Sequence, residues 1–195
     1  MRDEHKLFIS EFLRNPLRTA SVIPSSPKVA ERMAAPLPGE GDPVVVELGP
    51  GTGAFTAAIQ NRLSGRGLHL AVELNDRFAA LLRERFPAVD VTVGDAVHVR
   101  RLLDERELKC ADAVISGLPY ALFSQDLQHR LMGAVRDSLA PDGIFVAYAY
   151  VHACWAPPAR RFGQVLKAMF GEVAVSGVVW ANLPPAFVYT ATRLR

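Results

Sequence analysis

The chain has 195 residues, of which 50% are hydrophobic and 22% are charged, with 22 Lys and Arg against 20 Asp and Glu. This composition fits one domain with a buried core and excludes a disordered chain, while a net charge of +2 is far below that of a dedicated nucleic-acid-binding domain. Two cysteines, Cys110 and Cys154, exclude a disulfide scaffold and lack metal-ligand spacing. The polar start, Arg2 to Lys6, shows no signal peptide, so we expect a cytoplasmic protein with reduced thiols.

Two helices are predicted before residue 43. Residues 3–14 place their large apolar side chains on one face of a helical wheel, and Pro16 ends this helix. The apolar face fits either a membrane surface or the protein's own core. A second helix is predicted to begin at Ser25 or Ser26, with Pro27 in its first turn.

From Val44 onward, predicted strands alternate with predicted helices. Strands are expected at residues 44–48, 69–73, 89–93, 112–116, 144–150, 172–179 and 186–193. Helices are expected at residues 54–63, 76–85, 124–139 and 160–170. This alternation predicts a parallel, doubly wound α/β sheet. Little chain separates the last two strands, so we expect one antiparallel pair at an edge of the sheet.

Two uncharged runs lie in the second half of the chain, at residues 143–159 and 173–192. Prolines interrupt both runs, and neither offers the ~20 continuous apolar residues that a membrane-spanning helix needs. We therefore expect buried strands here and no membrane span, although the protein can still bind a membrane surface.

The strongest local motif is the segment Val44–Phe55, where a predicted strand leads into a glycine-rich turn that opens a helix. Glycines in such a turn let the backbone approach a ligand closely, because they carry no Cβ atom. Gly49, Gly51 and Ala54 also satisfy the dinucleotide-binding pattern, so the glycines alone do not identify the ligand.

Three acidic residues near the expected strand ends help to identify the ligand. Glu47 precedes the turn, Glu73 ends the second strand where ribose hydroxyls would bind, and Asp95 can accept from an adenine amine. Three carboxylates favour S-adenosylmethionine, which is cationic, and would repel the pyrophosphate of NAD. The predicted cofactor-binding residues are Glu47, Gly49, Pro50, Gly51, Thr52, Gly53, Glu73, Leu74, Asp95, Ala96 and Ser116.

The segment Ser116–Phe123 predicts a second turn at the same edge of the sheet. Its backbone carbonyls can accept hydrogen bonds from an attacking amine, and Tyr120 can form a wall for the transferred methyl group. Alternatively, the turn is merely rigid and Tyr120 packs in the core. The predicted catalytic residues are Gly117, Leu118, Pro119 and Tyr120.

No dedicated general base is required, because water can remove the amine proton before binding. If a side chain assists, the candidates are Tyr120, Tyr148, Tyr150 and His152, the last three of which alternate toward the end of one strand. Packing in the core is an equally good interpretation of these three residues.

These motifs resemble the bacterial phospholipid N-methyltransferase family of class I S-adenosylmethionine-dependent methyltransferases, which is related to the rRNA adenine dimethylases. Besides the two turns, Glu73 and Gly94–Ala96, two flanking stretches carry the resemblance, Asn15–Ser26 and Val179–Val188. It implies an α/β, Rossmann-like, seven-stranded and mostly parallel sheet with one antiparallel edge strand and N-terminal amphipathic helices.

The resemblance also implies the reaction, namely successive methylation of the phosphatidylethanolamine amine towards phosphatidylcholine. Residues 1–43 would form a helical segment that covers the site and binds the inner face of the membrane, and residues 44–195 would form the cofactor-binding domain. The expected partners are a phospholipid or small amine and the membrane surface, with no metal and no nucleic acid. The predicted substrate-binding residues are Pro24, Ser25, Tyr150 and Arg160.

Several alternatives stay open. The same fold serves soluble amine methyltransferases, and a cofactor-binding sensor or a dehydrogenase is a weaker interpretation. An rRNA adenine methyltransferase is disfavoured, because Gly117 stands where the dimethylases carry Asn or Asp and no C-terminal helical domain follows.

Overall fold

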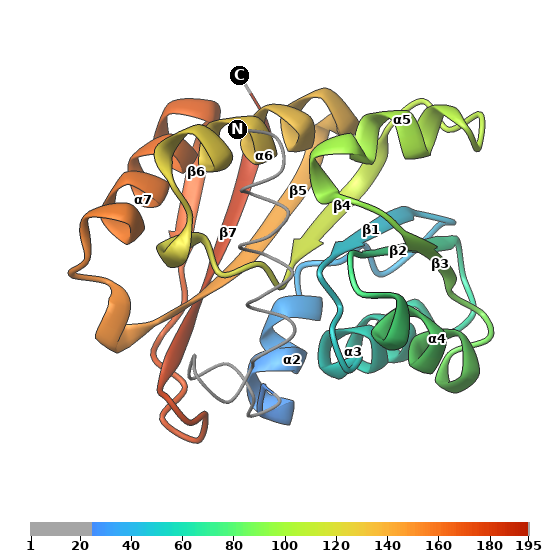
Figure 1. Ribbon diagram of the computed structural model, residues 1–195, viewed down its shortest axis with the longest axis horizontal. Coiled ribbons are helices and arrows are strands. Elements are labelled where there is room, and N and C mark those ends of the chain that lie inside the picture. The colour runs from blue at the N-terminus through green and yellow to red at the C-terminus, as the bar shows by residue number, and fades with distance from the viewer. Residues whose placement is uncertain (1–24, 195) are drawn as a thin grey trace.

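The computed structural model describes residues 25–194, which form one seven-stranded sheet between two layers of helices (Figure 1). The strand order is β3-β2-β1-β4-β5-β7-β6. The strands are β1 Val44–Leu48, β2 Leu68–Glu73, β3 Asp90–Val93, β4 Ala111–Ser116, β5 Leu139–Tyr150, β6 Phe170–Val175 and β7 Ala186–Leu194. The helices are α2 Pro27–Ala34, α3 Ala54–Leu63, α4 Asp76–Arg85, α5 Val99–Asp104, α6 Gln125–Ser138 and α7 Pro157–Met169. Three short 3₁₀ turns are η2 Ala96–His98, η3 Tyr120–Leu122 and η4 Val151–Ala153.

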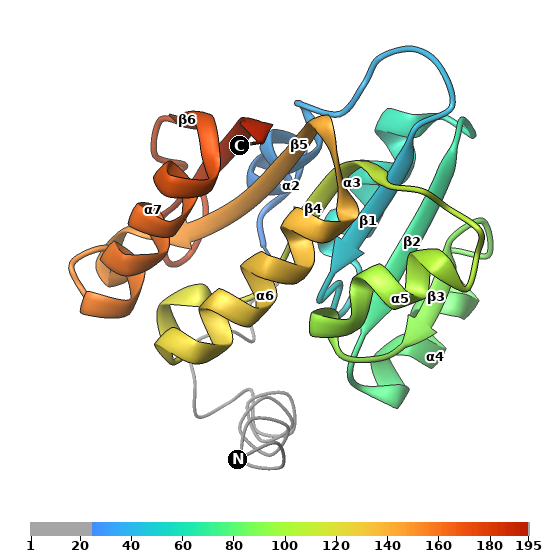
Figure 2. The ribbon, with the colours of Figure 1, turned by 90° about the horizontal axis from the view of Figure 1, so that it is seen from above.

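The helices divide between the two faces of the sheet, as Figures 1 and 2 show from two directions. Helices α5, α6 and α7 cover one face, where Leu103, Leu131 and Leu166 belong to one buried cluster. Helices α2 and α3 cover the opposite face through Met33 and Ile59, and α4 adds a small cluster there. The central strands are buried on both faces, which explains their continuous apolar sequences.

The predicted antiparallel pair at one edge of the sheet is confirmed, because β6 and β7 run antiparallel. The reversed strand, β7, is second from the edge and also pairs antiparallel with β5, so the outermost strand, β6, runs in the same direction as the parallel strands. The chain therefore inserts its last strand between two earlier ones.

Local capping signals place most helix starts where the sequence predicts them. The Ser26 side chain accepts a hydrogen bond from the Val29 N–H and begins α2, and Ser124 begins α6 in the same way. Helix α7 begins at Pro157, three residues before its predicted start, because proline suits a first helical turn that lacks a side-chain cap.

The predicted helix at residues 3–14 lies outside the described residues. Within residues 25–194, no helix is long and apolar enough to cross a membrane.

Candidate functional site

A cleft opens where the carboxyl ends of β1, β2, β3 and β4 meet. Its walls come from four successive strand ends, as the strand order of a doubly wound sheet requires. The residues that line it are Gly49, Gly51, Val72, Glu73, Leu74, Gly94, Asp95, Ala96, Gly117, Leu118, Pro119, Phe123 and Leu131. The structure thus brings together six of the predicted cofactor-binding residues and three of the predicted catalytic ones.

The two predicted turns touch each other beneath the cleft. Gly49 and Gly51 have φ angles of 69° and 56°, which lie in the left-handed region that favours glycine. A Cβ atom on Gly117 would lie 2.7 Å from the Gly49 carbonyl oxygen, so a side chain there would displace the backbone of the glycine turn. The close approach of the two turns therefore depends on glycine at both positions.

Glu73 connects the end of β2 to the glycine turn. Its Oε2 atom accepts a hydrogen bond from the Gly51 N–H at 2.9 Å, and its Oε1 atom accepts from the Asn75 N–H at 2.8 Å. A carboxylate in this place occupies an N–H group that a dinucleotide-binding turn would present to a pyrophosphate, and its charge would repel that group. The geometry favours a ligand whose hydroxyl groups donate to Glu73.

Replacing Glu73 by alanine is expected to weaken S-adenosylmethionine binding by about thirtyfold, the loss of one hydrogen bond to a charged acceptor. Glu73→Gln should lose nearly as much, because its amide NH₂ would face the N–H of Gly51 or Asn75. Isothermal titration of the purified variants measures both values. Unchanged affinity in both variants would contradict a role for Glu73 in cofactor binding.

The affinity for the cofactor should also depend on pH through Glu73. Burial raises the pKa of this carboxyl above its ordinary value of 4.5, and the backbone N–H groups of Asn75 and Gly51 oppose the shift. Since an acceptor for hydroxyl groups must be ionised, affinity should fall on acidification at a pH above 4.5. The stability of the fold should depend on pH in the opposite direction. A carboxyl whose pKa is raised by folding stabilises the folded state at low pH, and this stabilisation is lost as pH rises through the raised pKa. Titrations across pH test this, with Glu73→Gln lacking both effects.

The remaining acidic residue of the cleft is Asp95, which lines it beside Ala96. The Oδ1 atom of Asp95 accepts a hydrogen bond from the Val97 N–H at 3.1 Å and so begins η2. This bond orients the carboxylate at the end of β3.

Glu47 does not line the cleft, which corrects the expectation that three carboxylates surround the ligand. Its Oε2 atom accepts hydrogen bonds from Thr56 Oγ1 at 2.8 Å and from His69 Nε2 at 3.1 Å, between the sheet and α3. The physical reason is strand alternation: Val46 and Leu48 face the α5–α6 layer, so Glu47 faces α3. Its Oε1 atom is buried without a hydrogen-bond partner among the described residues.

Four other predicted cofactor-binding residues also lie outside the cleft lining. Pro50, Thr52 and Gly53 shape the turn, and Gly53 adopts a left-handed conformation at the start of α3. Ser116 is fully buried, and its Oγ atom lies 3.1 Å from the Tyr120 hydroxyl and accepts from the Leu118 N–H. These residues position the two turns instead of contacting the cleft.

A second cavity adjoins the cleft and shares Pro119 with it. Aromatic side chains from β5, β7 and α7 dominate its walls, and none of the lining residues within 25–194 is Arg, Lys, Asp or Glu. The residues that line it are Pro119, Tyr120, Ala121, Leu122, Tyr148, Ala149, Tyr150, His152, Ala153, Cys154, Ala159, Phe162, Phe187 and Tyr189. The arrangement can exclude water from an organic group placed beside the cleft.

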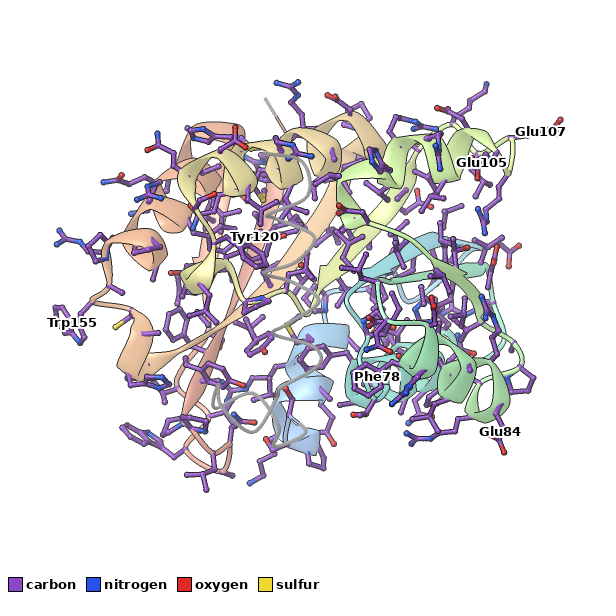
Figure 3. The ribbon with its side chains drawn as sticks, in the orientation of Figure 1. Phe78, Glu84, Glu105, Glu107, Tyr120 and Trp155 are labelled. Carbon is purple, nitrogen blue, oxygen red and sulfur yellow. The ribbon has the colours of Figure 1, made fainter. Side chains whose placement is uncertain are left out.

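Tyr120 joins the second cavity to the core, and Figure 3 shows it inside the molecule. Its ring stacks on Phe162 with centroids 4.0 Å apart, and only 3% of the residue is exposed. Burial raises the pKa of the Tyr120 hydroxyl, which therefore stays neutral near pH 7 and is not a base there. Tyr120 is therefore better interpreted as a core residue than as a catalytic one, although it also lines the second cavity.

Tyr120→Phe should therefore retain activity within a few-fold and lose about 1 kcal/mol of unfolding free energy with the bond to Ser116. Tyr120→Ala should lose about 3–5 kcal/mol, because it leaves a cavity against Phe162. Denaturant unfolding and methyl-transfer rates on both variants measure these effects. If the Tyr120→Phe variant folds but its methyl-transfer rate falls a hundredfold, the hydroxyl has a catalytic role.

The predicted substrate-binding residues are dispersed in the structure. Tyr150 lines the second cavity, and Arg160 is exposed in the first turn of α7 next to Ala159 of the lining. Ser25 lies apart, in a shallow groove between α2 and α3, because Ser26 begins α2 there. Pro24 lies outside the described residues.

Residues from late in the chain complete the cavity, and none of them is among the site residues predicted from the sequence. Phe187 and Tyr189 lie on β7, with ring centroids 5.2 Å apart, and Phe162 contacts Tyr189 from α7. Their aromatic character is visible in the sequence, but their position beside Pro119 depends on the insertion of β7 next to β5.

S-adenosylmethionine fits the groups of the cleft. Glu73 and Asp95 can accept from ribose hydroxyls and an exocyclic amine, and Val72, Leu118 and Leu131 provide an apolar surface for a base. A Cβ atom on Gly49 would lie 2.7 Å from Cδ2 of Leu118, so glycine at this position lets the two turns pack closely beside the cleft. When bound, this cofactor supplies a methyl group on a cationic sulfur.

Sequence comparison identifies relatives of two kinds. The chain is 35% identical to the ornithine lipid N-methyltransferase of Singulisphaera acidiphila over 186 residues, which cover 94% of this chain and 93% of that protein. It is 36% identical to the ribosomal RNA small subunit methyltransferase A of Bordetella avium over 99 residues, 49% of this chain but only 36% of that protein. No protein-family model matches the chain.

Solved structures share the fold at low sequence identity. An O-methyltransferase from Bacillus cereus in complex with SAH superposes with a TM-score of 0.68 at 14% identity, covering 97% of this chain and 89% of that one. A SAM-dependent O-methyltransferase from Thermotoga maritima gives 0.65 at 16% identity, over 94% and 72% of the two chains. Together with the full-length lipid relative, these similarities place the chain in the bacterial phospholipid N-methyltransferase family, as an S-adenosylmethionine-dependent class I methyltransferase.

Proposed function

We propose that the enzyme methylates the amine of a membrane lipid headgroup, with phosphatidylethanolamine as the acceptor and phosphatidylcholine as the final product. The observation that carries the proposal is the aromatic cavity that meets the cofactor cleft at Pro119. A headgroup amine in this cavity would lie beside the cleft while its glycerol and acyl chains remain outside. The full-length relative that acts on ornithine lipid supports an amine on a lipid.

The cavity provides an environment that favours the reactive form of the amine. An alkylammonium ion with a pKa near that of lysine costs about 4 kcal/mol to deprotonate at pH 7, three units at about 1.36 kcal/mol each. Apolar walls disfavour the charged form and so reduce this cost. Tyr148, Tyr150 and Phe187 line the cavity, and aromatic rings attract a methylated ammonium product placed over their faces.

The turn at Gly117 supplies an acceptor for the amine hydrogens. The Leu118 carbonyl accepts from the Tyr120 N–H at 3.0 Å, and the Pro119 carbonyl accepts from the Leu122 N–H at 2.9 Å. The Gly117 carbonyl takes part in no backbone hydrogen bond within residues 25–194. We propose that the Gly117 carbonyl accepts a hydrogen bond from the amine and so orients it. Tyr120 would contribute through packing alone.

Phosphatidylethanolamine and ornithine lipid differ in a way that Arg160 can detect. Phosphatidylethanolamine carries a phosphate next to its amine, and an exposed arginine beside the cavity can bind that group. The headgroup of an ornithine lipid has no phosphate. Arg160→Ala should therefore lower activity on phosphatidylethanolamine and leave activity on ornithine lipid unchanged, if the enzyme accepts both.

The direct test is transfer of labelled methyl groups from S-adenosylmethionine to vesicles that contain phosphatidylethanolamine, ornithine lipid or neither, with the products resolved. Mono-, di- and trimethylated phosphatidylethanolamine would establish the proposal and the number of transfers. Label in ornithine lipid alone would transfer the assignment to that headgroup. Label only in soluble amines or in ribosomal RNA would overturn a lipid acceptor.

The N-terminal segment, residues 1–43, is proposed to cover the site and to bind the membrane. Its described part begins next to the loop between β6 and β7, where the Ser26 N–H donates to Asn182 Oδ1 at 2.7 Å. A chain lacking residues 1–15 should bind vesicles more weakly and lose lipid methylation together with that binding. A soluble amine methyltransferase would keep its activity after this deletion.

A further inference from the structure

The two tryptophans of the chain, Trp155 and Trp180, are both on the surface, with 81% and 75% of each residue exposed. Leu183 is 69% exposed and Leu122 is 45% exposed. Exposed tryptophan is uncommon on a soluble surface unless it contacts a partner, because its large apolar area remains in water. These four residues, called the tryptophan rim below, require an explanation that the cofactor and acceptor sites do not provide.

Two residues of the tryptophan rim are at or next to the lining of the aromatic cavity, and one hydrogen bond joins the loop of the other two to it. Leu122 lines the cavity directly, and Trp155 follows Cys154 of the lining. Trp180 and Leu183 lie in the loop that enters β7, and the Val151 N–H donates to the Pro185 carbonyl at 2.9 Å, which joins this loop to η4. Figure 3 shows Trp155 at the outer edge of the molecule, pointing away from the sheet.

The segments around Trp155, Trp180 and Leu183 lack acidic residues. No Asp or Glu lies between Asp142 and Glu172, and none lies between Glu172 and the end of the chain. The two uncharged runs of the sequence lie side by side in the fold, because β5 and β7 pair with each other. Arg160 is exposed beside this surface.

Helix α2 adds basic groups near the same surface. The Arg32 guanidinium donates to the Gly177 carbonyl, and Lys28 is exposed one turn earlier. Glu31 of the same helix lies in the groove toward α3 instead. Basic groups attract anionic lipid headgroups, and exposed indole rings favour the interface between a membrane and water. A surface that combines the two with few carboxylates suits an anionic membrane.

We infer that the tryptophan rim is a membrane-docking surface, which inserts Trp155, Trp180 and Leu183 among lipid headgroups and opens the aromatic cavity toward the bilayer. The inference rests on the proposed lipid acceptor. It adds a second membrane contact, independent of residues 1–24, that aligns the cavity with its substrate. A lipid amine could then enter the site without leaving the bilayer completely.

Intrinsic fluorescence tests the docking surface directly, since the rim contains both tryptophans. The full chain is mixed with vesicles of phosphatidylethanolamine and phosphatidylglycerol, with and without brominated acyl chains. Emission should shift to shorter wavelength, and brominated lipid should quench it. Trp155→Phe and Trp180→Phe, each with one tryptophan left, should both show the effect.

A triple variant, Trp155→Ala with Trp180→Ala and Leu183→Ala, should reduce vesicle binding by about tenfold. Val93→Ala is the matched control, because Val93 is an exposed apolar residue on β3 at the opposite edge of the sheet. Cofactor affinity of the triple variant should equal that of the wild type. Its kcat/KM for monomeric short-chain phosphatidylethanolamine should also be unchanged, while methylation of vesicles falls.

The outcomes separate this inference from the proposed function. Quenching by brominated lipid without methylation of any aminolipid would overturn the lipid acceptor and retain the docking surface. If the protein methylates short-chain lipid but its tryptophan emission does not change when vesicles are added, the docking surface is overturned and the lipid acceptor is retained. A concentration-dependent dimer in sedimentation velocity that buries the tryptophans without vesicles would assign the rim to a second copy of the chain and overturn the inference.

Discussion

Gly117→Ala is expected to lower kcat/KM for methyl transfer by about a hundredfold, because small displacements of a reacting group have effects of this size. The added Cβ atom would lie 2.7 Å from the Gly49 carbonyl oxygen and 3.5 Å from the Leu48 carbonyl oxygen. Backbone atoms cannot move aside as the end of a side chain can, so the two turns must separate. Cofactor affinity and acceptor orientation should both decline.

Gly133→Ala is the matched control for this substitution. Gly133 lies within α6, and a Cβ atom there meets no other atom within 4 Å. It should stabilise the helix by about 0.5–1 kcal/mol and leave kcat/KM unchanged. Titration calorimetry and initial rates on both variants measure the contrast. Gly117→Ala with wild-type cofactor affinity and rate would show that the turns tolerate separation.

Gly117 also bears on the choice of acceptor. Asparagine, which the resemblance places at this position in rRNA adenine dimethylases, would make the same Cβ contact with Gly49. The substitution Gly117→Asn should therefore impair the enzyme without converting it to methylate a planar adenine amine.

The sequence predicts the cleft well because its residues follow strand ends. Glu73 is the last residue of β2, Asp95 and Gly117 come directly after β3 and β4, and the carboxyl ends of neighbouring parallel strands necessarily meet. Glu47, by contrast, is absent from the residues of the described chain that line the cleft. It lies within a strand, where alternation decides which face it occupies, and the polar partner on α3 is visible only in the folded chain.

The aromatic cavity could not be predicted in the same way. Its lining combines η3, the end of β5, the start of α7 and β7, which are separated by up to about seventy residues of chain. Their proximity requires β7 to insert between β5 and β6 in a particular register, with Tyr150 opposite Ala186. Pairing register is a long-range property that no local pattern specifies.

Glu47→Ala is expected to destabilise the fold by about 3–5 kcal/mol, the usual effect of removing one partner from a buried charged cluster. Gln60 Nε2 lies 3.0 Å from His69 Nδ1 and donates to it, so the imidazole proton lies on Nε2 and is donated to Glu47. Alanine would leave the His69 N–H and the Thr56 hydroxyl without an acceptor beneath the glycine turn. Denaturant unfolding measures the loss.

Two comparisons isolate the cause. Glu47→Gln keeps an acceptor oxygen for Thr56 and His69 and should lose much less stability than Glu47→Ala. The charge of Glu47 also helps to raise the pKa of Glu73, so Glu47→Gln should move the acid limit of cofactor binding to lower pH. In a double-mutant cycle, Glu47→Ala and His69→Ala should show an interaction of about 1–3 kcal/mol. Additive losses would mean that the cavity left by each side chain, and not the hydrogen bond between them, determines the effect.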